Sequence, residues 1–214
     1  MIHFGPCGDL QVLVESASAG RTARAPRCLD SPCASILAEL GELNRESAPL
    51  AAGAFWKDLT RSTGELPDDP GRGLLARGMR TVESLVGRDA VPLCFSHGDF
   101  APWNMVRVDG QILLFDWEYA SRAMPPGFDA VHFLVQTGAL LEGRSPAAIA
   151  RDLLESDVLR RVAGASDGLF LPLLLLALMG QLKDCARGER GDFASLQRLS
   201  MILQLFLSGE AARA

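Results

Sequence analysis

The sequence feature that most constrains the fold is the pair Asp109-Gly110, which separates the runs NMVRV and QILLF. Both runs are rich in β-favouring residues. An Asp-Gly pair between two such runs predicts a two-residue β-hairpin turn, because both turn residues need a positive φ angle. The chain is therefore expected to fold back on itself here, with two short strands side by side. The register that follows from this turn pairs Val108 with Gln111 and Met105 with Leu114.

Around this hairpin the chain is predicted to be mainly helical. A Pro-, Gly- and Asp-rich stretch at 62–73 predicts a loop, and LQVLVE at 10–15 predicts a strand. Apolar residues recur at helical spacing elsewhere, and Asp30-Ser31-Pro32 is a typical helix start. The predicted helices run from residue 31 to about residue 45, and then over 74–87, 129–142, 147–162, 168–187 and 192–208. We thus expect an α+β, predominantly helical fold.

Three polar residues are expected to meet at the open end of the hairpin. In the predicted register Asn104 lies beside Phe115, next to Asp116, and Asp99 is in the loop that leads into the hairpin. Regular alternation would point Asn104 and Asp116 to opposite faces, so their convergence requires the strand ends to depart from regular geometry. Asn and Asp oxygens suit Mg²⁺, which keeps several waters and binds substrate phosphates. A separate carboxylate can accept a proton from a hydroxyl nucleophile, so the cluster suits phosphoryl transfer from a nucleotide.

The motifs HGDFAPWN and LLFDWEYA, in this order around the turn, resemble the aminoglycoside phosphotransferase and choline kinase family. This family is the small-molecule branch of the protein kinase-like fold. The resemblance implies that Asp99 is the catalytic base and that Asn104 and Asp116 bind the metal. It also implies that ATP and Mg²⁺ are used to phosphorylate a hydroxyl of a small molecule that is aminoglycoside-, choline- or sugar-like.

The beginning of the chain resembles the hinge between the two lobes of such kinases. Residues 1–20 would be a remnant of the small lobe with the hinge, and residues 21–214 the helical, kinase-like large (C-terminal) lobe. The residues whose backbone would bind the nucleotide are Glu15, Ser16 and Ala17. We expect the small lobe to be largely absent, because no Gly-rich loop is found near the start and neither lysine suits the phosphate-binding strand.

Three interpretations of this chain stay open at the level of sequence. It is a fragment of a longer kinase, it works with a noncovalent partner that supplies the small lobe, or it is a kinase-like binding or regulatory module without phosphoryl transfer. The face on which a small lobe packs would be exposed and apolar, and such a patch usually marks an interface. A homodimer contact or a small-lobe partner is expected to cover that face.

Composition excludes several other classes. The net charge of −5 argues against nucleic acid as a partner, because phosphate backbones bind basic faces. The five cysteines are odd in number and lack zinc-site spacing, which favours free thiols in a cytoplasmic protein. The most apolar window, 168–182, is shorter than the roughly 20 residues that span a bilayer, so we expect a buried core helix and no membrane partner.

Three residues near the motifs are expected to be structural. His97 and His132 are predicted to be core histidines whose hydrogen bonds are satisfied. The resemblance implies that His97 orders the loop. Asp129 is predicted to cap the N-terminus of a helix.

Overall fold

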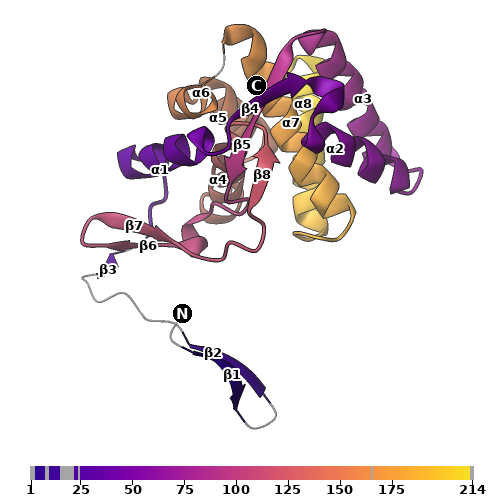
Figure 1. Cartoon of the computed structure of the whole chain (residues 1–214). Helices are drawn as coiled ribbons and strands as arrows, with labels where there is room; N and C mark the ends of the chain where they lie inside the picture. Colours follow the sequence, from indigo (N-terminus) through magenta and orange to yellow (C-terminus); the bar gives the residue numbers. More distant parts are fainter. Residues whose placement is uncertain (1–2, 8–9, 15–21, 24, 165, 213–214) are drawn as a thin grey trace.

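The computed structural model describes residues 3–7, 10–14, 22–23, 25–164 and 166–212. Figure 1 shows a body of packed helices with the β6–β7 hairpin beneath α1 at its margin. The helices are α1 (Ser31–Glu42), α2 (Ala54–Glu65), α3 (Pro70–Val86), α4 (Phe128–Gln136), α5 (Pro146–Glu155), α6 (Asp157–Ala163), α7 (Asp167–Ala186) and α8 (Phe193–Ser208). A π-helical turn, Thr137–Leu141, continues α4.

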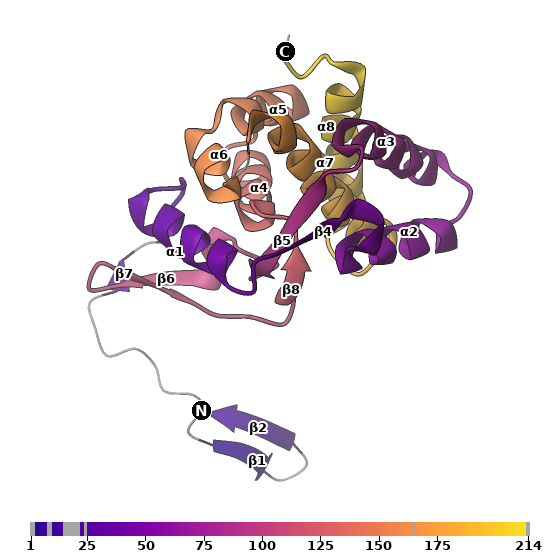
Figure 2. The ribbon, with the colours of Figure 1, turned by 45° about the horizontal axis from the view of Figure 1, so that its top comes forward.

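The strands of this part of the chain form three small antiparallel sheets, whose arrangement can be followed in Figure 2. The first sheet is β1 (His3–Cys7) with β2 (Leu10–Val14). The second has the order β3 (Thr22–Ala23), β6 (Met105–Val108), β7 (Gln111–Leu114). The third has the order β4 (Glu46–Pro49), β5 (Ala90–Ser96), β8 (Ser121–Met124). The loop that carries Asp99 follows β5 directly, and the second half of the motif lies between β7 and β8.

The predicted hairpin is confirmed in both turn and register. Asp109 and Gly110 have φ angles of 48° and 84°. The observed pairs are Val108 with Gln111, Arg107 with Ile112, Val106 with Leu113, and Met105 with Leu114. The turn chemistry of two residues therefore fixes the position of every side chain along both strands.

Local capping signals account for the helix starts. The side chain of Asp30 accepts a hydrogen bond from the backbone of Cys33 at 3.2 Å and begins α1 as predicted. Asp69, Ser145, Ser156 and Asp192 cap α3, α5, α6 and α8 in the same way. Each cap satisfies a backbone N–H that the first helical turn leaves without a partner.

Helix α7 is the central element of the core. It packs against α2, α3, α4 and α8. Its apolar stretch, Gly168–Ala186, extends four residues beyond the predicted window and is long enough to cross a membrane by length and composition alone. However, 67% of that window is buried inside the protein. The burial supports the predicted core helix.

Several sequence predictions differ from the structure. The loop predicted over 62–73 is only the short connection between α2 and α3, because Asp69-Pro70 starts a helix rather than interrupting one. The helix predicted over 147–162 is divided at Ser156, whose hydroxyl caps α6. Strands β4 and β8 were not predicted, and β2 has a partner, β1, that was not expected.

Candidate active site

The loop at the start of the HGD motif is anchored by Asp129 of α4. The Asp129 carboxylate accepts hydrogen bonds from the backbone N–H groups of His97 at 2.7 Å and Gly98 at 2.9 Å. Asp129 is not the helix N-cap that the sequence predicted, because Gly127, in a left-handed conformation, occupies that position. A buried carboxylate that accepts two N–H groups holds a loop firmly. Asp129 therefore fixes the backbone from which Asp99 projects.

Gly98 is required where the loop passes Tyr119. Its φ is +85°, and a Cβ atom built on it would lie 2.2 Å from the backbone oxygen of Tyr119. The Gly98 carbonyl accepts a hydrogen bond from Nη1 of Arg190 at 2.5 Å. The Arg190 guanidinium also lies over the Tyr119 ring, 3.6 Å from its centroid. Three segments far apart in sequence thus meet at one glycine.

His97 is fully buried and both of its ring nitrogens have partners. Nδ1 accepts a hydrogen bond from the Asp99 backbone N–H at 3.3 Å, so Nε2 carries the proton and donates to the Phe115 carbonyl at 3.0 Å. The Trp117 ring lies 4.4 Å from the imidazole, centroid to centroid. These contacts agree with the predicted satisfied core histidine and tie the loop to the far strand of the hairpin.

The Asp99 carboxylate is held by donors from two directions. Oδ1 lies 2.7 Å from Nε2 of His132, and Oδ2 accepts a hydrogen bond from the Asn104 amide at 2.6 Å. Burial alone would raise the pKa of Asp99. The hydrogen bond from His132 and the charge of its ring when protonated, the hydrogen bond from Asn104 and the positive charge of Arg190 outweigh that effect, so the pKa of Asp99 lies below its ordinary value. Asp99 is therefore a carboxylate at neutral pH.

Asn104 lies opposite Phe115 at the open end of the hairpin, as the register predicted. The Phe115 N–H donates to the Asn104 carbonyl at 3.2 Å, and Asp116 is the next residue. Neither side chain follows strand alternation, because Asn104 ends a 3₁₀ turn, Pro102–Asn104, and Asp116 has a φ of 64°. Both residues therefore depart from regular strand geometry. Asn104 is buried and bonded to Asp99, whereas the Asp116 side chain is exposed.

A sequence profile of the phosphotransferase enzyme family matches residues 31–164, which is more than half of the chain. The match includes the HGD loop, the hairpin and α4. The chain belongs to the phosphotransferase enzyme family.

Solved structures resemble this phosphotransferase-family chain over most of its length. Choline kinase LicA from Streptococcus pneumoniae has 16% identity and a TM-score of 0.51, and the match covers 82% of this chain and 62% of that one. A glucosamine kinase (crystal form B) has 20% identity and a TM-score of 0.47, with 86% of this chain and 53% of that one covered. The similarity to the choline kinase shows the kinase-like fold. This chain spans less than two thirds of either relative, and a comparison with curated proteins finds no match.

Asp99 opens into a cavity of about 440 Å³. His132 and Gln136 of α4 line it together with Trp103 and Tyr119, and Arg190 and Asp192 close it from the loop between α7 and α8. The cavity thus combines two carboxylates, one guanidinium and aromatic surface beside the buried loop. Its size suits a small polar molecule with an apolar body.

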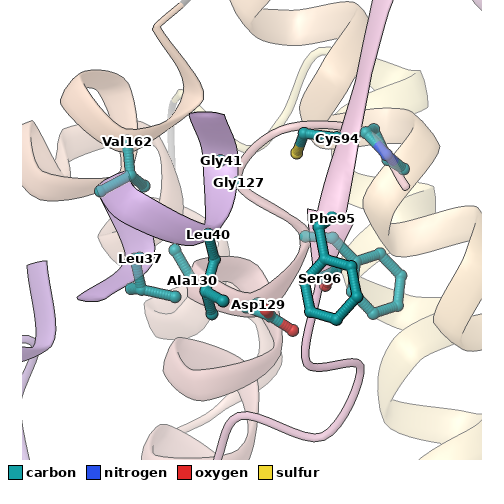
Figure 3. Close-up of a pocket in the computed structure, with 12 residues that line it drawn as sticks. Leu37, Leu40, Gly41, Cys94, Phe95, Ser96, Gly127, Asp129, Ala130 and Val162 are labelled. Carbon is teal, nitrogen blue, oxygen red and sulfur yellow. The ribbon is translucent and has the colours of Figure 1, made fainter. Parts of the chain in front are cut away.

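Figure 3 shows a second, much smaller cavity behind the loop, where α1, β5 and α4 meet. It encloses about 10 Å³, which is room for about one water molecule. Ser96 and Asp129 line it, and the buried Ser96 hydroxyl has no hydrogen-bond partner among the described residues. This cavity belongs to the support of the loop and is too small for a substrate.

The residues at the hairpin end fit Mg²⁺ in their chemistry. Both amide hydrogens of Asn104 are directed at Asp99, which leaves its amide oxygen as a hard ligand. Within the described part of the chain, no hydrogen bond or ion pair holds the exposed Asp116 carboxylate. No group of three or more His, Cys, Asp or Glu side chains among the described residues could hold a metal ion. Two protein oxygens are compatible with Mg²⁺, since that ion keeps waters and binds substrate phosphates.

The structure joins Asp99 to Asn104, places the exposed Asp116 one residue after Phe115, and adds residues that the sequence did not predict. The predicted nucleotide-binding residues Glu15, Ser16 and Ala17 lie outside the described residues. His132 was interpreted as an ordinary core histidine, but it contacts Asp99, and its Nδ1 atom has no hydrogen-bond partner in the part of the chain that the structure describes. Its position three residues after Asp129, on the same helical face, was the available signal. For Arg190 no local signal exists, because its segment is distant in sequence.

Proposed function

We propose that this chain carries the catalytic half of a small-molecule kinase. In this proposal the γ-phosphate of ATP is transferred to a hydroxyl of an aminoglycoside-, choline- or sugar-like acceptor. The observation that carries the proposal is the Asp99 carboxylate, which is held by Asn104 and His132 and faces a cavity large enough for a small alcohol. The family membership supports the same reaction class.

In the proposed reaction Asp99 acts as the general base. The acceptor oxygen forms a bond to the γ-phosphorus, the bond from that phosphorus to the bridging oxygen breaks, and ADP leaves. The hydroxyl proton moves to the Asp99 carboxylate, whose lowered pKa keeps it ionised beforehand. Asn104 and Asp116 would hold Mg²⁺, whose role when bound is to neutralise charge on the phosphates. Asp129 and Gly98 keep the loop in place while the proton moves.

A second candidate function follows from an exposed apolar stripe on the hairpin side of the site. Leu113, Phe115 and Trp117 are 43%, 46% and 41% exposed. Leu113 is in β7, and Phe115 and Trp117 are in the segment that follows it. Such a surface suits a covering partner, which we propose to be a small lobe or a second copy of this chain. The chain would then be one half of a split kinase or a non-catalytic module. Cys28, Cys33, Cys94 and Cys185 are free thiols, and a cytoplasmic location stays part of the proposal.

The decisive experiment measures ADP release and acceptor phosphorylation with a panel of aminoglycoside, choline and amino-sugar acceptors. It uses the chain alone and the chain with any in-frame upstream coding segment that supplies a Gly-rich loop and a strand lysine. Asp99→Asn and Asp116→Ala are each expected to lower kcat by at least about 100-fold. Asp68→Asn, an exposed carboxylate between α2 and α3, is the matched control and is expected to leave kcat unchanged. Substantial turnover in Asp116→Ala would refute the metal assignment. An inactive chain that lacks any such upstream segment would favour the module.

A further inference from the structure

His132 makes a contact with Asp99 that a core histidine would not need. Its side chain is 6% exposed, and its Nε2 atom lies 2.7 Å from Oδ1 of Asp99. We propose that His132 is a positioning residue, a neutral imidazole that donates from Nε2 and fixes the direction of the Asp99 carboxylate toward the cavity. The inference rests on the proposed function of Asp99 as the base.

The contacts of His132 indicate which of its ring nitrogens carries the proton. Its Nδ1 atom is buried and has no hydrogen-bond partner among the described residues. A proton on Nδ1 would leave a buried N–H without an acceptor, which costs about 1–3 kcal/mol. The charged groups that face the same cavity are Asp99, Arg190 and Asp192. Since only Asp99 is bonded to the ring, the proton belongs on Nε2, and Nδ1 stays a bare acceptor.

This arrangement fixes the carboxylate on both oxygens. His132 donates to Oδ1 from α4, and Asn104 donates to Oδ2 from the start of the hairpin. Rotation of the Asp99 carboxylate would break both hydrogen bonds, so its plane is set before an acceptor arrives. Each oxygen keeps a lone pair for the acceptor hydroxyl. Pre-set orientation of a base is a recognised source of rate acceleration.

The same geometry excludes a proton relay through His132. A relay would need a group that takes a proton from the far ring nitrogen, and Nδ1 has no hydrogen-bond partner among the described residues. In this proposal the proton from the acceptor is left on Asp99. His97 differs, because both of its nitrogens are committed to backbone groups of the loop and the hairpin.

The contact can be tested without any activity measurement. The chain has three histidines, so ¹⁵N-labelled full-length protein gives three sets of imidazole resonances, and His132→Gln identifies the set that belongs to residue 132. We expect the pattern of a neutral Nε2–H tautomer for His132. Its Nε2–H resonance should shift in Asp99→Asn, in which the charged acceptor is lost. The Nδ1–H tautomer, or a His132 resonance that ignores Asp99→Asn, would overturn the proposal.

Kinetics in a form that transfers phosphate supply the second measurement. His132→Leu is expected to lower kcat by about 10- to 100-fold with KM for the nucleotide unchanged, because only the direction of the base is lost. His132→Gln, whose amide N–H can replace Nε2–H, should recover most of that loss. Equal defects in the two variants, with unfolding temperatures like that of the unmodified chain, would overturn the positioning role. If instead Asp99→Asn keeps full activity, the proposed function fails, and the resonance experiment still decides whether His132 holds Asp99.

Discussion

Asp99 depends on residues that reach it from separate segments. Asn104 follows it by five positions, whereas His132 and Arg190 come from α4 and from the loop between α7 and α8. The first contact is local, so the motif spacing predicted it. The other two arise only when the helices pack, and no short sequence pattern contains them. The N-cap expectation for Asp129 was wrong for a related reason, since the capping rule sees the helix start but not the two loop N–H groups that reach the carboxylate.

A prediction at this scale concerns Arg190. Arg190→Ala is expected to lower kcat about tenfold or more in a form that transfers phosphate, because the loop loses its bond at Gly98. Arg190→Lys should recover little of the lost kcat, since one ammonium cannot both lie over the Tyr119 ring and reach the Gly98 carbonyl.

The matched control for this comparison is Arg187→Ala. Arg187 lies in the same connection but pairs with Glu65 and Glu189 at the surface. Steady-state kinetics and thermal unfolding are measured for all three variants. Full activity in Arg190→Lys would show that charge alone is needed and would contradict the proposed contact geometry.

The elements were predictable where their signals are local. The Asp109-Gly110 turn and the Asp30 cap are each set by a few adjacent residues, and both appear as predicted. Strands β4 and β8 are short segments, ESAP and SRAM, that pair with β5 only in the folded chain. Their pairing with distant residues, rather than their own propensity, makes them strands. A pattern-based reading therefore could not find them.

Gly98 and Gly110 offer a matched comparison within one motif. Their φ angles are +85° and +84°, but a Cβ atom at 98 would collide with the Tyr119 backbone, whereas one at 110 meets nothing within 4 Å. Gly110→Ala is expected to lower the free energy of unfolding by about 1–2 kcal/mol, the cost of a left-handed alanine. Gly98→Ala should cost clearly more, since the loop must also move. Urea unfolding measures both, and equal losses would contradict the close approach.

The start of α1 gives a prediction with a pH dependence. Burial would raise the pKa of Asp30, but the ion pair with Arg107 and the hydrogen bond from the Cys33 N–H lower it below its ordinary value. A carboxyl whose pKa is lower in the folded state stabilises the protein above its unfolded pKa, and this contribution is lost as the pH falls through the folded value. The stabilisation should therefore be full at neutral pH and decline below about pH 4.

Two variants separate the contributions of Asp30. Asp30→Ala removes both the cap and the ion pair and should cost about 1 kcal/mol of unfolding free energy at pH 7. Asp30→Asn keeps the cap and should cost less. Denaturant unfolding at pH 7 and pH 3 checks both values, and a loss in Asp30→Ala that stays constant between these pH values would contradict the linkage.

At the scale of the whole molecule, nucleotide affinity is the informative quantity. The two lysines lie on helices: Lys57 is exposed on α2, and Lys183 is committed to Asp58 and Asp184 at 2.8 Å each. Lys183 is therefore already paired with two carboxylates, and neither lysine has a hydrogen bond or ion pair with Asp116 among the described residues. Calorimetry of this chain with ATP and Mg²⁺ is therefore expected to show weak or undetectable binding. Micromolar affinity would contradict the view that a covering lobe is needed.

Helix α4 carries two contacts that serve the same loop. Asp129 and His132 are one turn apart. Asp129 accepts hydrogen bonds from the loop backbone, and His132 hydrogen-bonds to Asp99. If α4 shifts relative to the core, Asp129 and His132 therefore both move away from the loop. The core-facing residues of α4 include the buried Phe133. A mutation of a residue that packs beneath α4 would inactivate the protein although every residue of the HGD and DWE motifs was unchanged. Inspection of the motifs alone would then miss an inactive variant.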